Sequence, residues 1–403
     1  MGVCDLLSDV RPKMQWAVGG MSSVERAGVL GQGDNAVGIV CAAGMRWSQK
    51  RRSNFERGFR KSAMREPTLD IRTGHVDAFV SDNARVTGVV VDGRTVEADL
   101  VIAASGRAAR IAGDGRARAE GGNCGFSYVS RMYRALPGVQ VPVSPLPSGV
   151  LYRGYLTIAF PQDDNTISAL IVRPSADDAL AQLRHEAIFQ RATAMIPNLA
   201  PWTDPHRFEP ITPALAGSGL TNSYRSSLDA QGRIPLTGVL FVGDSLSTTN
   251  PAGGRGVSLG LMQAQTMLRL LDADTDLASV AEQLEVWCTE NIRPWYEDHV
   301  YWDATLLHRM AGGDIDLDAK IPSDLIAAAA EQIPEIAPAA GRYMTMVAPP
   351  SVLTPFEQQV RQLLRTGWRP PVGQGPTRDE LATLVRESAQ LISAQVGAAE
   401  HTR

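Results

Sequence analysis

The chain lacks the features that mark disulfide-bonded, zinc-binding or nucleic-acid-binding proteins. Its 403 residues include only four cysteines, none in a CxxC pair: Cys4, Cys41, Cys124 and Cys288. Scattered cysteines of this kind are typical of reduced cytoplasmic thiols. The formal net charge of -4 provides no basic excess for binding nucleic acid. The sequence therefore predicts a cytoplasmic protein without a nucleic-acid partner.

Long hydrophobic runs are also missing. No stretch approaches the roughly 18 apolar residues of a membrane-spanning helix, and the first residues contain no apolar run of signal-peptide length. We expect neither a membrane span nor a secretion signal. The composition, 44% hydrophobic and 20% charged, is that of an ordinary globular chain with a sizeable core.

The first patterned segments predict a helix followed by a small antiparallel sheet. Ser53 and Glu56 have the spacing of a capping box, which predicts a helix start. Residues 75–80 alternate in polarity, and residues 86–91 form a β-branched run. The Asp-Gly pair at 92–93 is typical of a type I′ hairpin turn.

The middle of the chain is predicted to hold most of the strands. "ADLVIAASGR" at 98–107 is interpreted as a fully buried strand. Alternating runs over 124–173 predict an antiparallel meander, with a turn at 163–165. A helix is predicted over 175–195, and we expect one of its faces to be formed by Leu180, Leu183 and Ala187.

Residues 293–403 are predicted to be mostly helical. The segment "RPWYEDHVYWD" at 293–303 is interpreted as a helix that packs its aromatic side chains on the core. Its ionisable side chains do not have the one-face spacing of a metal site, so we expect them on a solvated helix surface. They are Glu297, Asp298, His299 and Asp303, followed by His308.

The most informative stretch is "FVGDSLSTTNPAGGRGVSLG" at 241–260. Three large apolar residues at 240–242 predict a strand without a polar face, and Asp244 follows directly after it. Open α/β sheets place ligands at such strand ends. A glycine-rich turn then leads into a helix. We expect the helix to bury a stripe formed by Val257, Leu261, Ala264, Leu268 and Leu271.

The residue types in this stretch suit one kind of ligand. Unpaired backbone N–H groups at a helix start favour an anionic or electron-rich group, and glycines let the backbone approach it closely. The carboxylate of Asp244 accepts hydrogen bonds, so it suits hydroxyl donors. A hydroxylated chain beside an electron-accepting ring meets both requirements, and FAD is such a molecule.

"GDSLSTTNPAGGRGVS" resembles the second FAD-contact motif of the para-hydroxybenzoate hydroxylase-like flavoproteins, a superfamily of FAD-dependent oxidoreductases. Two further segments resemble that family, "VEADLVIAASGRAARI" and "RRSNFERGFR", and the three occur in its order. The resemblance covers roughly residues 45–275. It implies an α/β fold: a Rossmann-like FAD-binding domain, an inserted antiparallel sheet that roofs the substrate, and here a helical C-terminal region.

The resemblance also implies a set of cofactor-binding residues. In the family, the Asp of the second motif binds the ribityl hydroxyls, the Pro-to-Gly turn lines the isoalloxazine, and an Arg in the early helix reaches the ribityl–phosphate region. By matching position, the implied set is Arg52, Ser105, Gly106, Arg107, Gly243, Asp244, Pro251, Gly253, Gly254, Arg255, Gly256 and Val257. The resemblance implies no metal and names no catalytic side chain.

The family's first motif, a strand followed by G-x-G-x-x-G, has no convincing counterpart. Gly31, Gly33 and Ala36 fit the bare pattern, but a polar segment precedes them and too few residues separate them from Arg52 for a βαβ unit. We expect the FAD-binding domain to be N-terminally incomplete. A late start codon, degeneracy or a completing partner are the open explanations, and poor FAD binding by the chain alone is an expected consequence.

The expected layout assigns residues 1–120 and 226–290 to the FAD-binding domain, 121–225 to the substrate sheet and 291–403 to the helical region. The expected function is that of a FAD-dependent oxidoreductase, monooxygenase-like, acting on a hydrophobic small molecule, with NAD(P)H as a candidate electron donor. Two alternatives stay open: a flavin-linked reductase or dehydrogenase of the geranylgeranyl reductase type, and a non-catalytic remnant. The W-x-W-x-I-P segment of flavin halogenases is absent.

Overall fold

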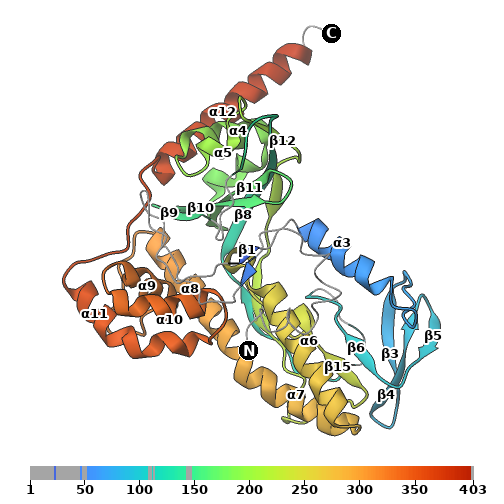
Figure 1. The fold of residues 1–403 in the computed structure, drawn as a ribbon. Helices are drawn as coiled ribbons and strands as arrows, with labels where there is room; N and C mark the ends of the chain where they lie inside the picture. The colour runs from blue at the N-terminus through green and yellow to red at the C-terminus, as the bar shows by residue number, and fades with distance from the viewer. Residues whose placement is uncertain are drawn as a thin grey trace.

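The protein is a mixed α/β chain of antiparallel sheets and helices (Figure 1). The structure, a computed structural model, describes residues 22–23, 46–47, 52–107, 111, 114–141 and 148–400. The segment at 31–36, which fits only the bare G-x-G-x-x-A pattern, lies outside these residues. Among the helices within them, none combines the length and the apolar character needed to span a bilayer.

The predicted helix and small sheet are confirmed. Helix α3 spans Arg52–Ala63, and a three-stranded antiparallel sheet follows, with β3 (Val76–Asp82), β4 (Arg85–Val91) and β5 (Arg94–Glu97). Asp92 and Gly93 have φ angles of 48° and 74°. Both central turn residues are thus in the left-handed region, as a type I′ turn requires.

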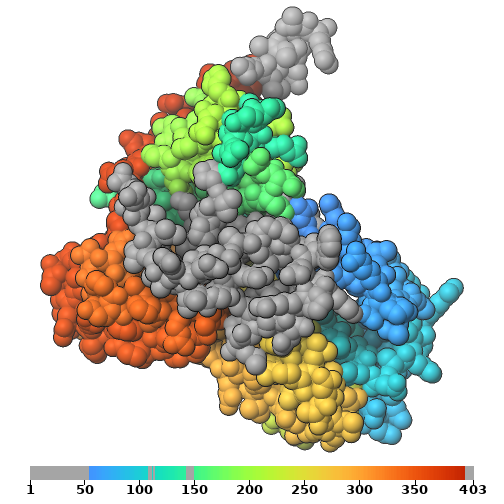
Figure 2. Space-filling view, viewed as in Figure 1, coloured from blue at the N-terminus to red at the C-terminus, as the bar shows by residue number. Residues whose placement is uncertain are grey.

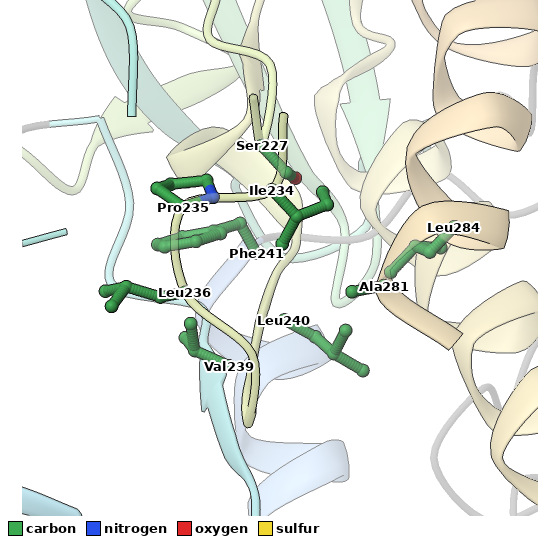
Figure 3. A pocket seen from close by; sticks show the side chains of 9 residues that line it. All are labelled: Ser227, Ile234, Pro235, Leu236, Val239, Leu240, Phe241, Ala281 and Leu284. Atoms are coloured by element: carbon green, nitrogen blue, oxygen red, sulfur yellow. The ribbon is translucent and has the colours of Figure 1, made fainter. Parts of the chain in front are cut away.

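Two parallel strands form the part of the fold that leads to the second motif. Strand β6 (Val101–Ala103) pairs in parallel with β15 (Val239–Phe241). All three residues of β15 are buried. Figure 3 shows that its side chains point to both sides: Leu240 points toward Ala281 and Leu284 of α7 (Leu277–Asn291), whereas Phe241 points to the opposite side.

The prediction that residues 98–107 form a fully buried strand is wrong. β6 has only three residues, and the side chain of Ile102 is 45% exposed. Among the described residues, β15 is the only strand that pairs with β6. An apolar run therefore did not by itself guarantee cover on both faces.

A larger antiparallel sheet lies above these elements in Figure 1. Its order is β12-β8-β11-β10-β9, with β13 also paired to β8. The strands are β8 (Phe126–Ala135), β9 (Ser148–Tyr152), β10 (Tyr155–Gln162), β11 (Thr166–Pro174), β12 (Phe208–Pro210) and β13 (Leu215–Gly217). The predicted meander is correct for β9, β10 and β11. It is wrong for β8, which pairs with β11 instead of its sequence neighbour β9.

The helix predicted over 175–195 is interrupted at His185. A 3₁₀ helix covers Asp178–Arg184, and α4 covers Glu186–Met195. Leu180 and Leu183 are buried as expected. Ala187 is exposed, because the break at His185 shifts the helical phase and turns Ile188 and Phe189 toward the core instead.

Helix α6 (Gly256–Ala273) follows the glycine-rich turn, but the predicted apolar stripe is the wrong face. Val257 is 58% exposed and Leu268 is 57% exposed. The buried positions are Leu259, Gln263, Thr266 and Met267. This helix is apolar on most of its circumference, so the hydrophobic pattern did not specify its rotation.

The remaining short elements form two further small sheets and one short helix. Strands β7 (Glu120–Asn123), β14 (Thr221–Tyr224) and β16 (Ser247–Thr248) form a three-stranded sheet in the order β16-β14-β7. Helix α5 (Ala200–Thr203) lies beside α4. Near the N-terminus, β1 (Ser22–Ser23) pairs antiparallel with β2 (Arg46–Trp47).

The C-terminal region is helical, as predicted. Its helices are α8 (Arg293–Met310), α9 (Ser323–Ala328), α10 (Ala337–Met344), α11 (Glu357–Arg365) and α12 (Arg378–Glu400). Helices α9–α11 form one side of the molecule, coloured orange to red in Figures 1 and 2, opposite α3 and its sheet. Helix α12 returns to the large sheet and packs on α4.

Candidate functional site

The carboxyl ends of β6 and β15 bring two of the predicted segments to one edge. The strands are parallel, so Ser105 and Gly106 leave β6 on the side where Gly243 and Asp244 leave β15. The hydroxyl of Ser245 lies 2.7 Å from the carbonyl oxygens of both Ala103 and Val242. This contact ties the two strand ends together.

Asp244 faces the start of helix α6. One of its carboxylate oxygens lies 3.9 Å from where a Cβ on Gly256 would stand, and both residues are exposed. Gly243 has a φ angle of 66°, and its N–H donates to Oε1 of the buried Gln263 at 2.7 Å. Helix α6 thus fixes the turn that presents the carboxylate of Asp244.

The loop before α6 exposes backbone in the way the sequence predicts. The side chain of Asn250 accepts a hydrogen bond from the N–H of Ala252 at 3.1 Å, and Gly254 has a φ angle of 68°. Pro251, Gly254 and Gly256 are exposed. The N-cap residue of α6 is Arg255, and its side chain makes no hydrogen bond to the first N–H groups of the helix. The side chain of Arg255 therefore does not satisfy the N–H groups at the positive end of this helix.

Arg255 differs from its neighbours because its side chain turns inward. Its side chain is 5% exposed, and its Nη1 donates to Oδ2 of Asp298 at 3.1 Å. The guanidinium also lies 4.7 Å from the ring centre of Trp295 and 4.5 Å from that of Tyr343. The predicted role of Arg255 in cofactor binding is therefore left to its backbone.

The other predicted arginines lie elsewhere around the edge. Arg107 is exposed, and its Nη1 donates to the carbonyl of Gly219 at 3.4 Å. Arg52 is the first residue of α3, and its side chain is outside the described part of the chain. The nearby Asn54 donates to Asp163 in the β10–β11 turn at 2.7 Å. Helix α3 therefore begins close to the large sheet.

Arg116, which the sequence did not single out, has a buried side chain that packs against β15. The guanidinium of Arg116 lies 3.5 Å from the ring centre of Phe241 and donates to the carbonyl of Ser245 at 3.0 Å. Burial, then the neighbouring Arg225, lower the pKa of Arg116 to about 10. Arg225 in turn forms a two-pronged ion pair with Asp114, at 2.7 and 2.9 Å.

The large sheet places its tyrosines on two different faces. Tyr133, Tyr152 and Tyr155 are buried on the face covered by α4 and α12. Tyr128 lies on the opposite face, within the apolar cluster that includes Ala252 of the loop and Trp302 of α8. Of the four tyrosines, only Tyr128 therefore shares a cluster with the candidate cofactor loop.

The sequence did not indicate the buried side chains of α8 that contact the loop at 250–256. The prediction of a solvated α8 surface is wrong for Asp298, His299 and Asp303, which are 6%, 0% and 4% exposed. The sequence does show that these three residues lie close together on one predicted helix. Their burial depends on the loop at 250–256 packing against α8, which is a long-range contact that no local pattern reports.

Comparison with solved structures identifies the fold. The chain superposes on the flavin-dependent brominase Bmp2 with a TM-score of 0.56, at 15% identity over 90% of this chain and 87% of that one. A triple mutant of Bmp2 gives a TM-score of 0.60 at 16% identity, covering 90% and 88%. A probable FAD-dependent monooxygenase from Pseudomonas aeruginosa, pqsL, gives 0.48 at 16%, covering 64% and 71%. The sequence matches no protein-family model and no curated protein.

These identities are low, so the comparison concerns the fold rather than the activity. The similarity to the Bmp2 triple mutant extends over 90% of this chain and 88% of that one. The chain therefore shares the overall fold of the flavin-dependent brominase Bmp2.

Proposed function

We propose that the protein is a FAD-dependent oxidoreductase, monooxygenase-like, that acts on a hydrophobic small molecule. The observation that carries this proposal is the meeting of Asp244 with the glycine-rich start of α6. The exposed carboxylate of Asp244 lies beside the exposed glycine at the start of this helix, an arrangement that suits a hydroxylated chain attached to an electron-accepting ring.

The residues present fit the cofactor. Glycine at 256 keeps open the space next to the carboxylate of Asp244, which a side chain would fill. Asp244 would hold the ribityl hydroxyls, and the backbone of 254–257 would lie against the pyrimidine edge of the ring. Ser105, Gly106 and Arg107 would lie at the neighbouring strand end. When bound, FAD would supply the redox chemistry.

The protein's own contribution is to orient the ring and to stabilise charge. Backbone N–H groups at the start of α6 favour negative charge on the electron-rich edge of a bound group without reorganising. The apolar face of the large sheet around Tyr128, together with Ala252 and Trp302, supports a hydrophobic substrate beside the loop. No side chain is assigned as an acid or base.

Similarity to a brominase does not make halogenation the best proposal. One fold serves several flavin chemistries, and this sequence lacks the W-x-W-x-I-P segment. The reductase alternative differs in its use of oxygen. Oxygen consumption that accompanies NAD(P)H oxidation would support the monooxygenase-like reaction, and NAD(P)H oxidation without it would support a reductase.

The cofactor assignment is tested with Asp244→Ala and a matched control. Asp272→Ala removes the same charge from an exposed position near the other end of α6. We expect Asp244→Ala to weaken FAD binding about 10- to 100-fold, because it removes charge-assisted hydrogen bonds worth on the order of 1.5–3 kcal/mol. Asp272→Ala should bind FAD like the unmodified protein.

Titration of each protein with FAD, followed by flavin fluorescence and by the visible absorbance of the flavin, measures both affinities. Equal weakening by the two substitutions would reduce the effect to net charge. No saturable binding by the unmodified protein would overturn the proposal.

A further inference from the structure

Helix α8 lies directly behind the loop at 250–256 and contacts it through three buried side chains. Asp298, His299 and Asp303 all lie on this helix, and each meets a different residue of the loop: Arg255, Gly253 and Asn250 respectively. The opposite side of the same loop exposes Pro251, Gly254 and Gly256. One side of the loop is thus held by α8, and the other is open.

The most complete of these contacts centres on Asp303. Its two carboxylate oxygens accept hydrogen bonds from Nδ2 of Asn222 at 2.7 Å and from Nδ2 of Asn250 at 3.0 Å. The side-chain oxygen Oδ1 of Asn222 accepts a hydrogen bond from the backbone N–H of Asn250 at 2.7 Å. The side-chain oxygen Oδ1 of Asn250 accepts a hydrogen bond from the backbone N–H of Ala252 at 3.1 Å. Each member of this buried chain therefore defines the position of the next.

His299 defines how closely the loop can approach α8. Its ring is fully buried, and a Cβ added to Gly253 would lie 2.2 Å from its Cε1 atom. Neither ring nitrogen has a hydrogen-bond partner in the described part of the chain. The ring thus acts as a neutral spacer against which the glycine backbone packs.

Arg255 adds a third contact deeper in the core. Its ion pair with Asp298 is itself supported by Tyr343, whose hydroxyl donates to Oδ2 of Asp298 at 2.6 Å. The Tyr343 oxygen also lies 2.8 Å from the hydroxyl of Ser323 on α9. The loop is therefore fixed to α8, α9 and α10 together.

We propose that Asp303 is a positioning residue for cofactor binding, and that it acts through Asn250 to hold the loop at 250–256 in the geometry that leads into the start of α6. The inference rests on the proposed function only for the identity of the ligand. The hydrogen-bonded chain from α8 to Ala252 predicts an ordered loop before any ligand binds.

The chain of hydrogen bonds offers a charge-swap test. In Asp303→Asn, the new amide offers one carbonyl oxygen to two amide donors, so one of these hydrogen bonds is lost. In Asn250→Asp, two carboxylates face each other. In the double variant Asn250→Asp/Asp303→Asn, the amide at 303 accepts from Asn222 and donates to the carboxylate at 250, which still accepts from Ala252. The double variant therefore restores every bond in the chain.

Hydrogen exchange of the protein without added FAD gives a readout that does not depend on cofactor binding. We expect each single substitution to speed exchange of the 252–254 amides at least 10-fold, and the double variant to return them to within about 3-fold of the original rate. FAD affinity should follow the same order. The matched control is Val300→Ala, which shortens an exposed side chain on the same helix and should change neither quantity.

The outcomes separate this inference from the proposed function. Loop exchange that follows the swap in a protein that binds no FAD would support the positioning role and reject the cofactor. FAD binding with loop exchange unchanged in Asp303→Asn would reject the positioning role alone. If a single variant fails to fold, the double variant decides: loop exchange as fast as in the worse single variant, or failure to fold, overturns the inference.

Discussion

Gly253 has no side chain at the point where the loop meets the ring of His299. Its φ angle is not positive, so backbone strain does not explain the glycine, and the space taken by His299 does. Gly253→Ala would place a methyl group 2.2 Å from Cε1 of this fully buried ring. We expect a loss of about 1–3 kcal/mol in the free energy of unfolding, the usual cost of overpacking.

Urea denaturation measures this loss, with Gly122→Ala as the control. Gly122 also has a negative φ angle, is exposed, and has nothing within 4 Å of its added Cβ. Adding His299→Ala to Gly253→Ala should recover part of the loss by making room. A Gly253→Ala variant as stable as the Gly122→Ala control would contradict the packing argument.

The same helix carries two buried groups whose effects on stability have opposite signs in acid. Burial raises the pKa of Asp303 to about 6, so its contribution is fully present below the unfolded pKa of about 3.9 and is lost as pH rises through 6. Burial, then the nearby Arg255, lower the pKa of His299 to about 3. Its contribution is present above about 6.5 and is lost as pH falls toward 3.

Urea midpoints between pH 4 and 7 separate the two groups. The free energy of unfolding of the original protein minus that of Asp303→Asn should fall by on the order of 2–3 kcal/mol from pH 4 to 6.5. The same difference taken with His299→Gln should rise over this range. Two differences that move in the same direction would show that one assignment is wrong.

At the scale of elements, the sequence predicted what local pattern determines. The helix at α3, the hairpin of β4 and β5 with its Asp-Gly turn, and the strand at β15 are confirmed. Each of these depends on nearby residues: a cap, two residues with positive φ, or a continuous apolar run. Asp244 follows β15 and Gly256 begins α6, and a Cβ added to Gly256 would lie 3.9 Å from the carboxylate, although the short strand β16 lies between the two in sequence.

What the sequence did not predict depends on contacts between distant elements. On α6 the buried Gln263 accepts a hydrogen bond from the N–H of Gly243, a contact that the hydrophobic pattern of the helix does not indicate. The pairing of β8 with β11 joins two strands that are not neighbours along the chain. Burial of Asp303 requires Asn222 and Asn250, which lie 81 and 53 residues away along the chain.

At the scale of the whole molecule, the chain returns to the large sheet after its helical region. Tyr155 on β10 donates to the carbonyl of Pro376 at 2.7 Å, and the N–H of Gly373 donates to the carbonyl of Leu151 at 2.7 Å. Arg378 then pairs with both carboxylate oxygens of Asp177, at 2.9 and 2.5 Å. The last helix therefore belongs to the core of the sheet region, although the sequence separates them by about 200 residues.

Helix α12 contributes to that core through a short apolar face, and this gives a prediction for the whole fold. Leu381 is 0% exposed and packs in the cluster that contains Leu180, Leu183 and Phe189. Leu381→Ala should lower the free energy of unfolding by about 2–5 kcal/mol, because it leaves a cavity between α12 and the sheet region. Leu391 on the same helix is 55% exposed, and Leu391→Ala should change the free energy of unfolding by less than about 0.5 kcal/mol.

Urea unfolding followed by far-ultraviolet circular dichroism and by tryptophan fluorescence distinguishes two ways in which α12 could contribute. If α12 is integral to the sheet region, Leu381→Ala should shift both transitions together, because Trp202 packs in the same cluster. An early loss of helical signal without a change in fluorescence would mean that α12 detaches on its own. In that case the return of the chain to the large sheet would be a local attachment and not part of the cooperative core.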